Sequence, residues 1–278
     1  MTTVRTSDGV RLHHTDTGPG TTGTTVVLVA GFMASAFTWQ LQVDALAAAG
    51  HRVVCLDRRN HGLSDFPAYG QRMGRHGQDL HEALTQLAID DAVVVGGSQG
   101  ASTVWACLDL HGTDRIRAVV SVDQTPRMLN GDGWEHGFYG YDRTNAGTYF
   151  SAEIPATGRG AGPERTLATL AVLARRVGGD PQEAMAALMP GLHPVTLPLL
   201  QDHALQDWRD VVARADVPVL MVAGADSQYW PAEHAEITAA STTRGRAVVL
   251  DDCGHAANLD RPEEFNAALL AFLEDVVR

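Results

Sequence analysis

The sequence predicts an α/β fold in which a mainly parallel central sheet is flanked by helices. Short runs rich in β-branched residues alternate with longer segments whose apolar residues recur at helical spacing, which is typical of βαβ units. The run Ala92–Val95 is continuously apolar, as expected of a strand covered on both faces. No internal repeat of solenoid length and no apolar run of the ~20 residues that span a bilayer interrupts this alternation.

The N-terminal part is predicted to contain five strands of the sheet after an opening hairpin strand. The runs Val4–Thr6 and Val10–Asp16 flank the turn-forming residues 7–9 and indicate that hairpin. The elements that follow are, in order, a strand at Thr25–Val29, a helix at Ala36–Ala49 that Gly50 ends, a strand at Arg52–Leu56, a helix at Gly74–Leu87, the strand at Ala92–Val95, a helix at Ala101–Leu110 and a strand at Ile116–Val122.

Residues 124–205 interrupt this rhythm. Gly, Pro and aromatic residues crowd Thr125–Pro163, and helical patterns follow at Glu164–Val177 and Pro181–Met189. A bare loop of this length is uncommon, so we predict a helical cap, or lid, inserted after the sixth strand, with 1–123 and 206–278 forming the core. The alternative is a disordered insertion, against which stand the aromatic residues Trp134, Phe138, Tyr139, Tyr141, Tyr149 and Phe150.

The sheet pattern resumes after the insertion and runs to the C-terminus. Its predicted elements are a strand at Val217–Ala223, a helix at Ala232–Ala240, a strand at Ala247–Leu250 and a helix at Pro262–Val277. The last helix has a favourable start, because Pro262 lies in its first turn and Glu263 and Glu264 face the positive end of the helix dipole.

The net charge of −12 argues against phosphate-rich or anionic partners, so we expect neither nucleic acid nor a membrane surface to bind. The three cysteines are too few and too widely spaced for a disulfide framework or a zinc site. Residues 1–5 lack the apolar core of a signal peptide, which favours a cytoplasmic location. The expected partner is therefore a small molecule; the sequence does not indicate an oligomeric state.

The segment Gly96-Gly97-Ser98-Gln99-Gly100 follows the predicted strand Ala92–Val95 and opens the next helix. It matches the pattern G-x-S-x-G, in which a serine stands on a sharp strand-to-helix turn and small residues on either side relieve crowding. The alternative is an ordinary glycine-rich turn, but a dinucleotide fingerprint needs a glycine where Ser98 stands. We therefore predict Ser98 as a nucleophile.

A histidine and two candidate acids follow other predicted strands. His255 comes after the last strand, where catalytic groups gather in open α/β sheets, and is the candidate general base. Asp226, just past the strand Val217–Ala223, is favoured as the acid that orients it, because that strand should lie nearest to the histidine's strand. Asp123, past the strand Ile116–Val122, is the rival.

An oxyanion hole needs two preorganised N–H donors. The backbone N–H of Gln99 is one candidate, because Gln99 starts the helix after the nucleophile. The backbone N–H of Phe32 is the other, since Gly31 lets the chain turn toward the site directly after the strand Thr25–Val29.

The chain order Ser98, Asp226, His255, together with the segment Asp57–Asp65 and the run from Gly254-His255 to Phe265, resembles the α/β-hydrolase superfamily. The resemblance is greatest to its small esterases, lactonases and cofactor-free haloperoxidases (perhydrolases). It implies a serine hydrolase that cleaves a carboxylic ester or lactone through an acyl-enzyme, with no cofactor. The serine is unlike the Asp nucleophile of the superfamily's haloalkane dehalogenases and epoxide hydrolases. Alternatives within the superfamily are perhydrolysis, a lyase or cofactor-free oxygenase, and a ligand receptor.

Apolar and aromatic residues near these motifs suit a small, mostly apolar substrate. The candidate pocket residues are Gly31, Trp39, Trp134, Phe138, Tyr139 and Trp230; each aromatic could instead simply pack the cap against the core. The remaining histidines do not occur in the H-E-x-x-H pattern or with paired ligand spacing, so we expect no metal site.

Overall fold

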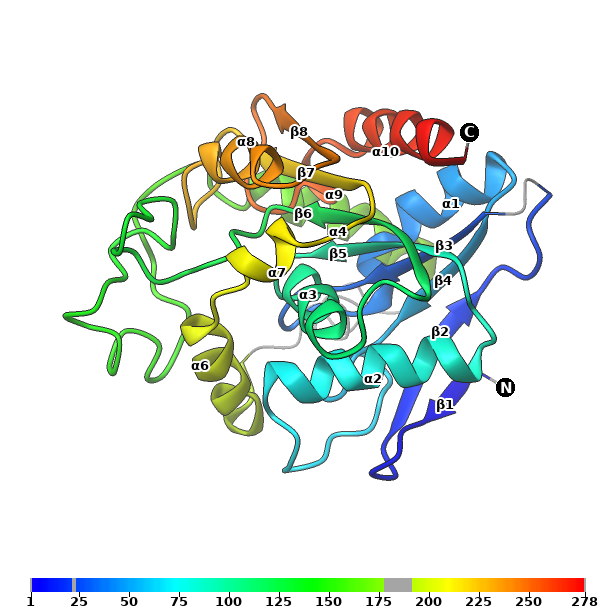
Figure 1. Cartoon of the computed structure of the whole chain (residues 1–278), viewed down its shortest axis with the longest axis horizontal. Coiled ribbons are helices and arrows are strands. Elements are labelled where there is room, and N and C mark those ends of the chain that lie inside the picture. The colour runs from blue at the N-terminus through cyan, green and yellow to red at the C-terminus, as the bar shows by residue number, and fades with distance from the viewer. Residues whose placement is uncertain (1, 22–23, 178–191, 278) are drawn as a thin grey trace.

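The computed structural model (Figure 1) describes residues 2–21, 24–177 and 192–277. Its centre is an eight-stranded sheet with the order β1-β2-β4-β3-β5-β6-β7-β8. β1 and β2 are antiparallel, and β3 to β8 run parallel to one another. The strands are β1 (Thr3–Arg5), β2 (Arg11–Asp16), β3 (Thr25–Val29), β4 (Arg52–Leu56), β5 (Ala92–Gly97), β6 (Ile116–Val122), β7 (Val219–Gly224) and β8 (Gly245–Leu250).

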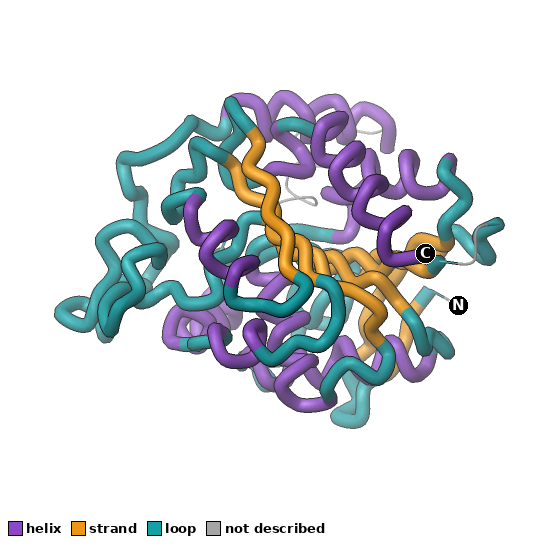
Figure 2. The backbone as a smooth tube through the Cα atoms, turned by 45° about the horizontal axis from the view of Figure 1, so that its top comes forward, coloured by secondary structure: helices purple, strands orange, loops and turns teal. Residues whose placement is uncertain are grey.

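Helices cover both faces of the sheet, which Figure 2 shows as orange strands enclosed by purple helices. Side chains of β5 alternate between the two faces: Val94 packs with residues of α2 and α3, and Val93 and Val95 pack with residues of α1 and α10. One layer contains α2 (Met73–Gln86), α3 (Gln99–His111), α7 (Arg209–Ala213) and α8 (Glu233–Ala240), and the other contains α1 (Gln40–Ala48), α9 (Ala257–Asp260) and α10 (Pro262–Val277).

The predicted fold class is confirmed, and several predicted bounds coincide with the observed ones. β3, β4, β6 and α10 begin and end where the sequence pattern places them. The predicted helix at Ala36–Ala49 is two elements, a 3-10 turn η1 (Ala36–Trp39) and then α1. The short helices α7 and α9 were not predicted, because four or five residues carry too little periodicity to be recognised.

The insertion is irregular over residues 124–163, and the described residues that follow are mostly helical. α4 (Glu164–Val177) has the predicted bounds, and η2 (Pro194–Thr196) and α6 (Leu197–Leu205) follow. The predicted helix Pro181–Met189 lies outside the described residues. The aromatic residues of the irregular part pack together, with Phe138, Tyr141 and Phe150 buried against Leu200 of α6 and Trp230 of the core. The division of the chain into a core and a cap stays a prediction.

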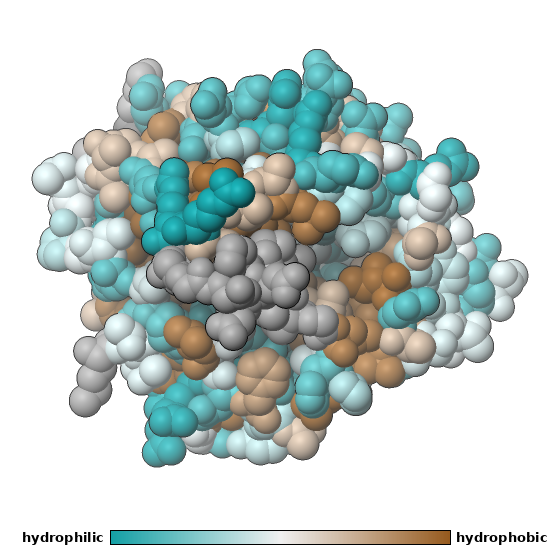
Figure 3. All heavy atoms as spheres, turned by 180° about the vertical axis from the view of Figure 1, so that it is seen from behind, coloured by the Kyte–Doolittle hydropathy of each residue, from teal (hydrophilic) through white to brown (hydrophobic). Residues whose placement is uncertain are grey.

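The surface mixes hydrophilic and hydrophobic side chains, as the rear view in Figure 3 shows for one face. Leu63, Phe66 and Tyr69 of the loop after β4 are exposed, as are Leu167 and Val172 of α4. Within residues 2–21, 24–177 and 192–277, no helix has the length and apolar character needed to cross a membrane.

Candidate active site

The candidate site residues follow the carboxyl ends of the parallel strands. The register pairs Gly97 of β5 with Val122 of β6, so the next residues, Ser98 and Asp123, leave the sheet at the same level. β7 ends at Gly224, which pairs with the last residue of β8. Loops from neighbouring strands therefore converge at one edge of the sheet, where ligands bind in open α/β folds.

Ser98 stands on the sharp turn between β5 and α3. Its backbone angles are φ 49° and ψ −128°, a strained conformation for a residue with a side chain. A Cβ at Gly96 would lie 2.4 Å from Ala101 N, and one at Gly100 would lie 2.2 Å from Val29 O. Only glycines at these two positions allow the turn to pack this closely, which is the physical basis of the G-x-S-x-G pattern.

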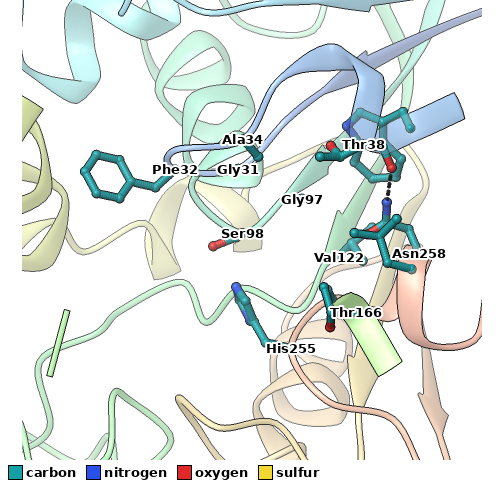
Figure 4. Close-up of a pocket in the computed structure, with 13 residues that line it drawn as sticks. Gly31, Phe32, Ala34, Thr38, Gly97, Ser98, Val122, Thr166, His255 and Asn258 are labelled. Atoms are coloured by element: carbon teal, nitrogen blue, oxygen red, sulfur yellow. Dashed lines mark hydrogen bonds between the residues drawn. The ribbon is translucent and has the colours of Figure 1, made fainter. Parts of the chain in front are cut away.

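His255 faces Ser98 across the site (Figure 4), and a buried carboxylate contacts its Nδ1. Its Nδ1 lies 2.7 Å from Oδ2 of Asp123, whose side chain is fully buried. The carboxylate also accepts hydrogen bonds from Ser227 Oγ at 2.6 Å and from Gly224 N at 3.1 Å. Because an ionised carboxylate only accepts, His255 Nδ1 carries the proton, which leaves Nε2 free to act as a base.

Two imidazoles keep Asp123 ionised in spite of its burial. Burial alone would raise the pKa of Asp123, but His234 and His255 together lower it from 3.8 to about 2. His234 Nε2 lies 3.9 Å from Asp123 Oδ1, so it acts through its proximity, whereas His255 donates directly. The acid therefore stays charged throughout the pH range in which the protein would work.

The structure does not bring Asp226 to the histidine, so the expectation that Asp226 orients His255 is corrected in favour of Asp123. β7 is indeed the strand next to β8, but Asp226 lies two residues beyond its end and its side chain is exposed. The turn that follows, with Ser227 N bonded to Gly224 O at 3.2 Å, directs Ser227 inward in its place. Adjacency of strands did not reveal which side chain of the loop faces the interior.

The predicted oxyanion donors lie on two segments beside the nucleophile. Gln99 is the first residue of α3, so its N–H has no partner within the helix. The turn after β3 passes so close to the nucleophile that a Cβ at Gly31 would lie 3.8 Å from Ser98 Oγ. Phe32, the next residue, lines the space around Ser98. Both segments are thus placed beside the reacting oxygen.

A buried arginine that the sequence analysis missed ties these two segments together. The Arg58 side chain is fully buried within the protein, and burial lowers its pKa to about 9. Among the described residues no carboxylate lies within ion-pair distance of its guanidinium. Its five N–H groups contact five acceptors instead: Ala30 O at 3.0 Å, Gly31 O at 2.7 Å, Gln99 Oε1 at 2.8 Å, His61 Nε2 at 3.0 Å and His76 Nδ1 at 3.2 Å.

Ser98 and Phe32 line two cavities, called here the outer and the inner cavity. The outer cavity, of ≈ 100 Å³, is the one that His255 lines, and Figure 4 shows its walls. Its other lining residues include Gly31, Thr38, Trp39, Thr166, Asn258 and Leu259. The inner cavity, of ≈ 30 Å³, is the one that Gln99 lines. Its walls are Met128, Phe138, Phe150, Ile154, Leu200, His203, Tyr229 and Trp230.

The predicted pocket residues divide among these cavities. Gly31 and Trp39 line the outer cavity, and Phe138 and Trp230 line the inner one. Trp134 and Tyr139 line neither: the Trp134 indole donates to a backbone carbonyl at 2.9 Å, and the Tyr139 ring lies under an arginine.

Several polar residues of the site carried no sequence signal. Ser227, Gln228 and His203 occur in no motif, and their roles depend on contacts made across the chain. Gln228 Oε1, for example, accepts the His255 backbone N–H at 2.9 Å. Within the described residues, no group of three or more His, Cys, Asp or Glu side chains is arranged to hold a metal ion.

Comparison with known proteins agrees with this architecture. The family described as "alpha/beta hydrolase fold" matches residues 24–262. The chain is 28% identical to a non-heme chloroperoxidase of Streptomyces lividans over 99% of this chain and 100% of the relative, and 30% identical to epoxide hydrolase A of Mycobacterium tuberculosis over 96% and 95%. A solved bromoperoxidase from Bacillus anthracis superposes with a TM-score of 0.78 at 25% identity, covering 98% and 99% of the two chains. The chain belongs to the α/β-hydrolase-fold family.

Proposed function

We propose that the protein is a serine hydrolase that cleaves a carboxylic ester or lactone of a small, mostly apolar substrate. The observation that carries the proposal is the contact between buried Asp123 and His255 Nδ1, at 2.7 Å, in a histidine that lines the same cavity as Ser98. This arrangement makes His255 Nε2 a base next to a strained, half-buried serine hydroxyl. The apolar side chains of both cavities support the choice of substrate.

The first half of the reaction forms an acyl-enzyme. Ser98 Oγ attacks the carbonyl carbon while His255 Nε2 takes its proton, and Asp123 stabilises the imidazolium that results. The backbone N–H groups of Phe32 and Gln99 donate to the carbonyl oxygen as it becomes negatively charged. His255 then gives the proton to the leaving alkoxide, which departs as the alcohol.

The second half returns the enzyme to its starting state. His255 takes a proton from water, the resulting nucleophile attacks the acyl carbon, and the acid leaves as Ser98 regains its proton. For a lactone, the alcohol and the acid are the two ends of one product. Residues of this chain carry out every step, so the proposal includes no cofactor.

The test is Ser98→Ala. The wild type should hydrolyse p-nitrophenyl esters and be labelled by a fluorophosphonate, with mass spectrometry placing the label on Ser98. The variant should lose both properties, since it retains the cavities but not the nucleophile. Ester hydrolysis at the wild-type rate in the purified variant would contradict the proposal.

Perhydrolysis is a second candidate, because relatives carry the names non-heme chloroperoxidase and bromoperoxidase. In this reaction hydrogen peroxide replaces water in the second half, so that acetyl-Ser98 would give peracetic acid and the free serine. Formation of peracid from acetate and hydrogen peroxide, lost in Ser98→Ala, would support it. Hydrolysis of esters without peracid formation would leave plain hydrolysis alone.

A further inference from the structure

The inner cavity contains polar atoms that the proposed chemistry does not use. Gln99, Trp230 and His203 all line it, and their side chains are 1%, 2% and 5% exposed. Within the described residues Gln99 Nε2, Trp230 Nε1 and His203 Nδ1 are buried without a hydrogen-bond partner. A buried polar atom that lacks a hydrogen-bond partner destabilises the folded protein. A ligand group bound in the cavity that these three residues line would give these atoms partners.

Arg58 fixes which way the Gln99 amide points. An arginine has only donors, so the Gln99 atom at 2.8 Å from Arg58 Nη1 is the amide oxygen. Nε2 then lies on the opposite side of the amide and has two N–H groups to donate. The guanidinium itself cannot take a ligand, because all five of its N–H groups already face acceptors.

The other two unpartnered atoms are compatible with the same ligand group. Trp230 Nε1 only donates. His203 is neutral, because burial first and Arg58 second lower its pKa to about 3, and a neutral imidazole can donate through Nδ1. Gln99 Nε2 and Trp230 Nε1 can only donate, and His203 Nδ1 can also donate. The ligand group that fits all three atoms is therefore a hydrogen-bond acceptor. Most of the other wall residues are apolar, as at Met128 and Phe150, and Ser98 and Tyr229 add hydroxyl groups. Among the described residues no lysine or arginine lines the cavity, so a carboxylate would be buried there without a counter-charge.

We propose that the inner cavity selects esters whose short acyl chain carries a neutral acceptor oxygen, an ether or a ketone, within reach of Gln99 Nε2. The inference rests on the proposed ester hydrolysis. It assigns the acyl chain to the inner cavity because His255, which must protonate the leaving oxygen, lines the outer cavity. Gln99 thus has two roles, with its backbone serving the oxyanion and its side chain serving specificity.

The test compares esters that differ by one oxygen in place of a methylene. p-Nitrophenyl methoxyacetate is matched with the butanoate, and 3-methoxypropanoate with the pentanoate. Each kcat/KM is divided by the rate constant for hydroxide-catalysed hydrolysis of the same ester, which removes the electronic effect of the oxygen. We expect the wild type to prefer at least one ether by about 2- to 12-fold, the range of one net hydrogen bond.

Variants locate the preference. Gln99→Met keeps the backbone N–H and the length of the side chain, and should bring the ratio of ether to carbon ester close to 1. Trp230→Phe replaces the indole and its N–H by a smaller phenyl ring, and should lower the ratio at least twofold, which keeps the test decisive if Gln99→Met does not fold. Trp208→Phe is the control, because the Trp208 indole is also buried and unpartnered but lines neither cavity, and its ratio should equal that of the wild type.

The outcomes separate the two proposals. No turnover of any ester and no labelling of Ser98 would remove the proposed function. Turnover of all four esters with normalised ratios near 1, or a preference that Gln99→Met and Trp230→Phe leave unchanged, would overturn the acceptor site alone.

Discussion

Replacing Asp123 by Asn should nearly abolish catalysis, because the amide forces the wrong imidazole tautomer. Oδ2 of Asp123 accepts from both His255 and Ser227, and Oδ1 accepts from Gly224 N. An amide nitrogen at Oδ1 would meet that fixed backbone N–H, donor against donor, so the nitrogen must take the place of Oδ2. The Ser227 hydroxyl can rotate to accept, but His255 Nδ1 can accept only by giving up its proton to Nε2.

His255 Nε2 then carries a proton and cannot remove one from Ser98. In a serine protease triad the same change lowers kcat about 10⁴-fold, or about 5.4 kcal/mol in the barrier, and we expect a loss of that order here. The assay is steady-state hydrolysis of p-nitrophenyl acetate, with fluorophosphonate labelling of Ser98 measured in parallel.

Asp226→Asn is the matched control for this substitution. The Asp226 side chain is exposed, so its change should alter kcat by less than about twofold and the free energy of unfolding by about 0.5 kcal/mol at most. Loss of activity in Asp226→Asn with retention in Asp123→Asn would refute the assignment of the acid.

Three further predictions concern stability and thiol reactivity. Because the pKa of Asp123 is lowered from 3.8 to about 2, its ionised form stabilises the folded state above pH ~4; urea unfolding should show this contribution lost as the pH falls toward 2, and Asp123→Asn should lack that pH-dependent part. Gly100→Ala should destabilise by about 1–3 kcal/mol because its Cβ would lie 2.2 Å from Val29 O, whereas Gly74→Ala in α2, with nothing within 4 Å, should stabilise by up to ~1 kcal/mol; equal unfolding free energies would contradict this. All three cysteines are free and buried, and burial raises the pKa of two of them to about 12, so Ellman's reagent should react with them only after denaturation.

Most of the sheet could be predicted from the sequence, because its parallel strands are short runs rich in β-branched residues. β3 and β6 were predicted to the residue for this reason. β8, which starts with Gly245 and Arg246, begins two residues before the predicted strand. The turn at Ser98 was equally predictable, because the two glycines that it needs are local in sequence. Such features depend on neighbours a few residues away, which the sequence displays directly.

The acid and the inner cavity depend on contacts between distant residues, which the sequence does not display. Asp226 and Asp123 both follow a strand of the sheet; only the direction of the turn at Ser227 decides between them. His203 comes to the cavity from α6, more than a hundred residues from Gln99. No periodicity or motif marks such a residue, because its position is set by how α6 packs against the rest of the protein.

The way the insertion joins the sheet has a consequence for how such enzymes diversify. The chain leaves the sheet after β6 at the start of residues 124–205 and returns to it at β7, and β6 and β7 pair with each other. The two ends also touch, with Trp208 N bonded to Pro126 O at 2.9 Å. The distance that the insertion must close is therefore the same whatever its length, and doubling its length adds only about 0.6 kcal/mol to the entropic free-energy cost of closing the loop. Insertions and deletions between the two ends can therefore change the walls of the inner cavity with little loss of stability in the sheet that positions Ser98, Asp123 and His255.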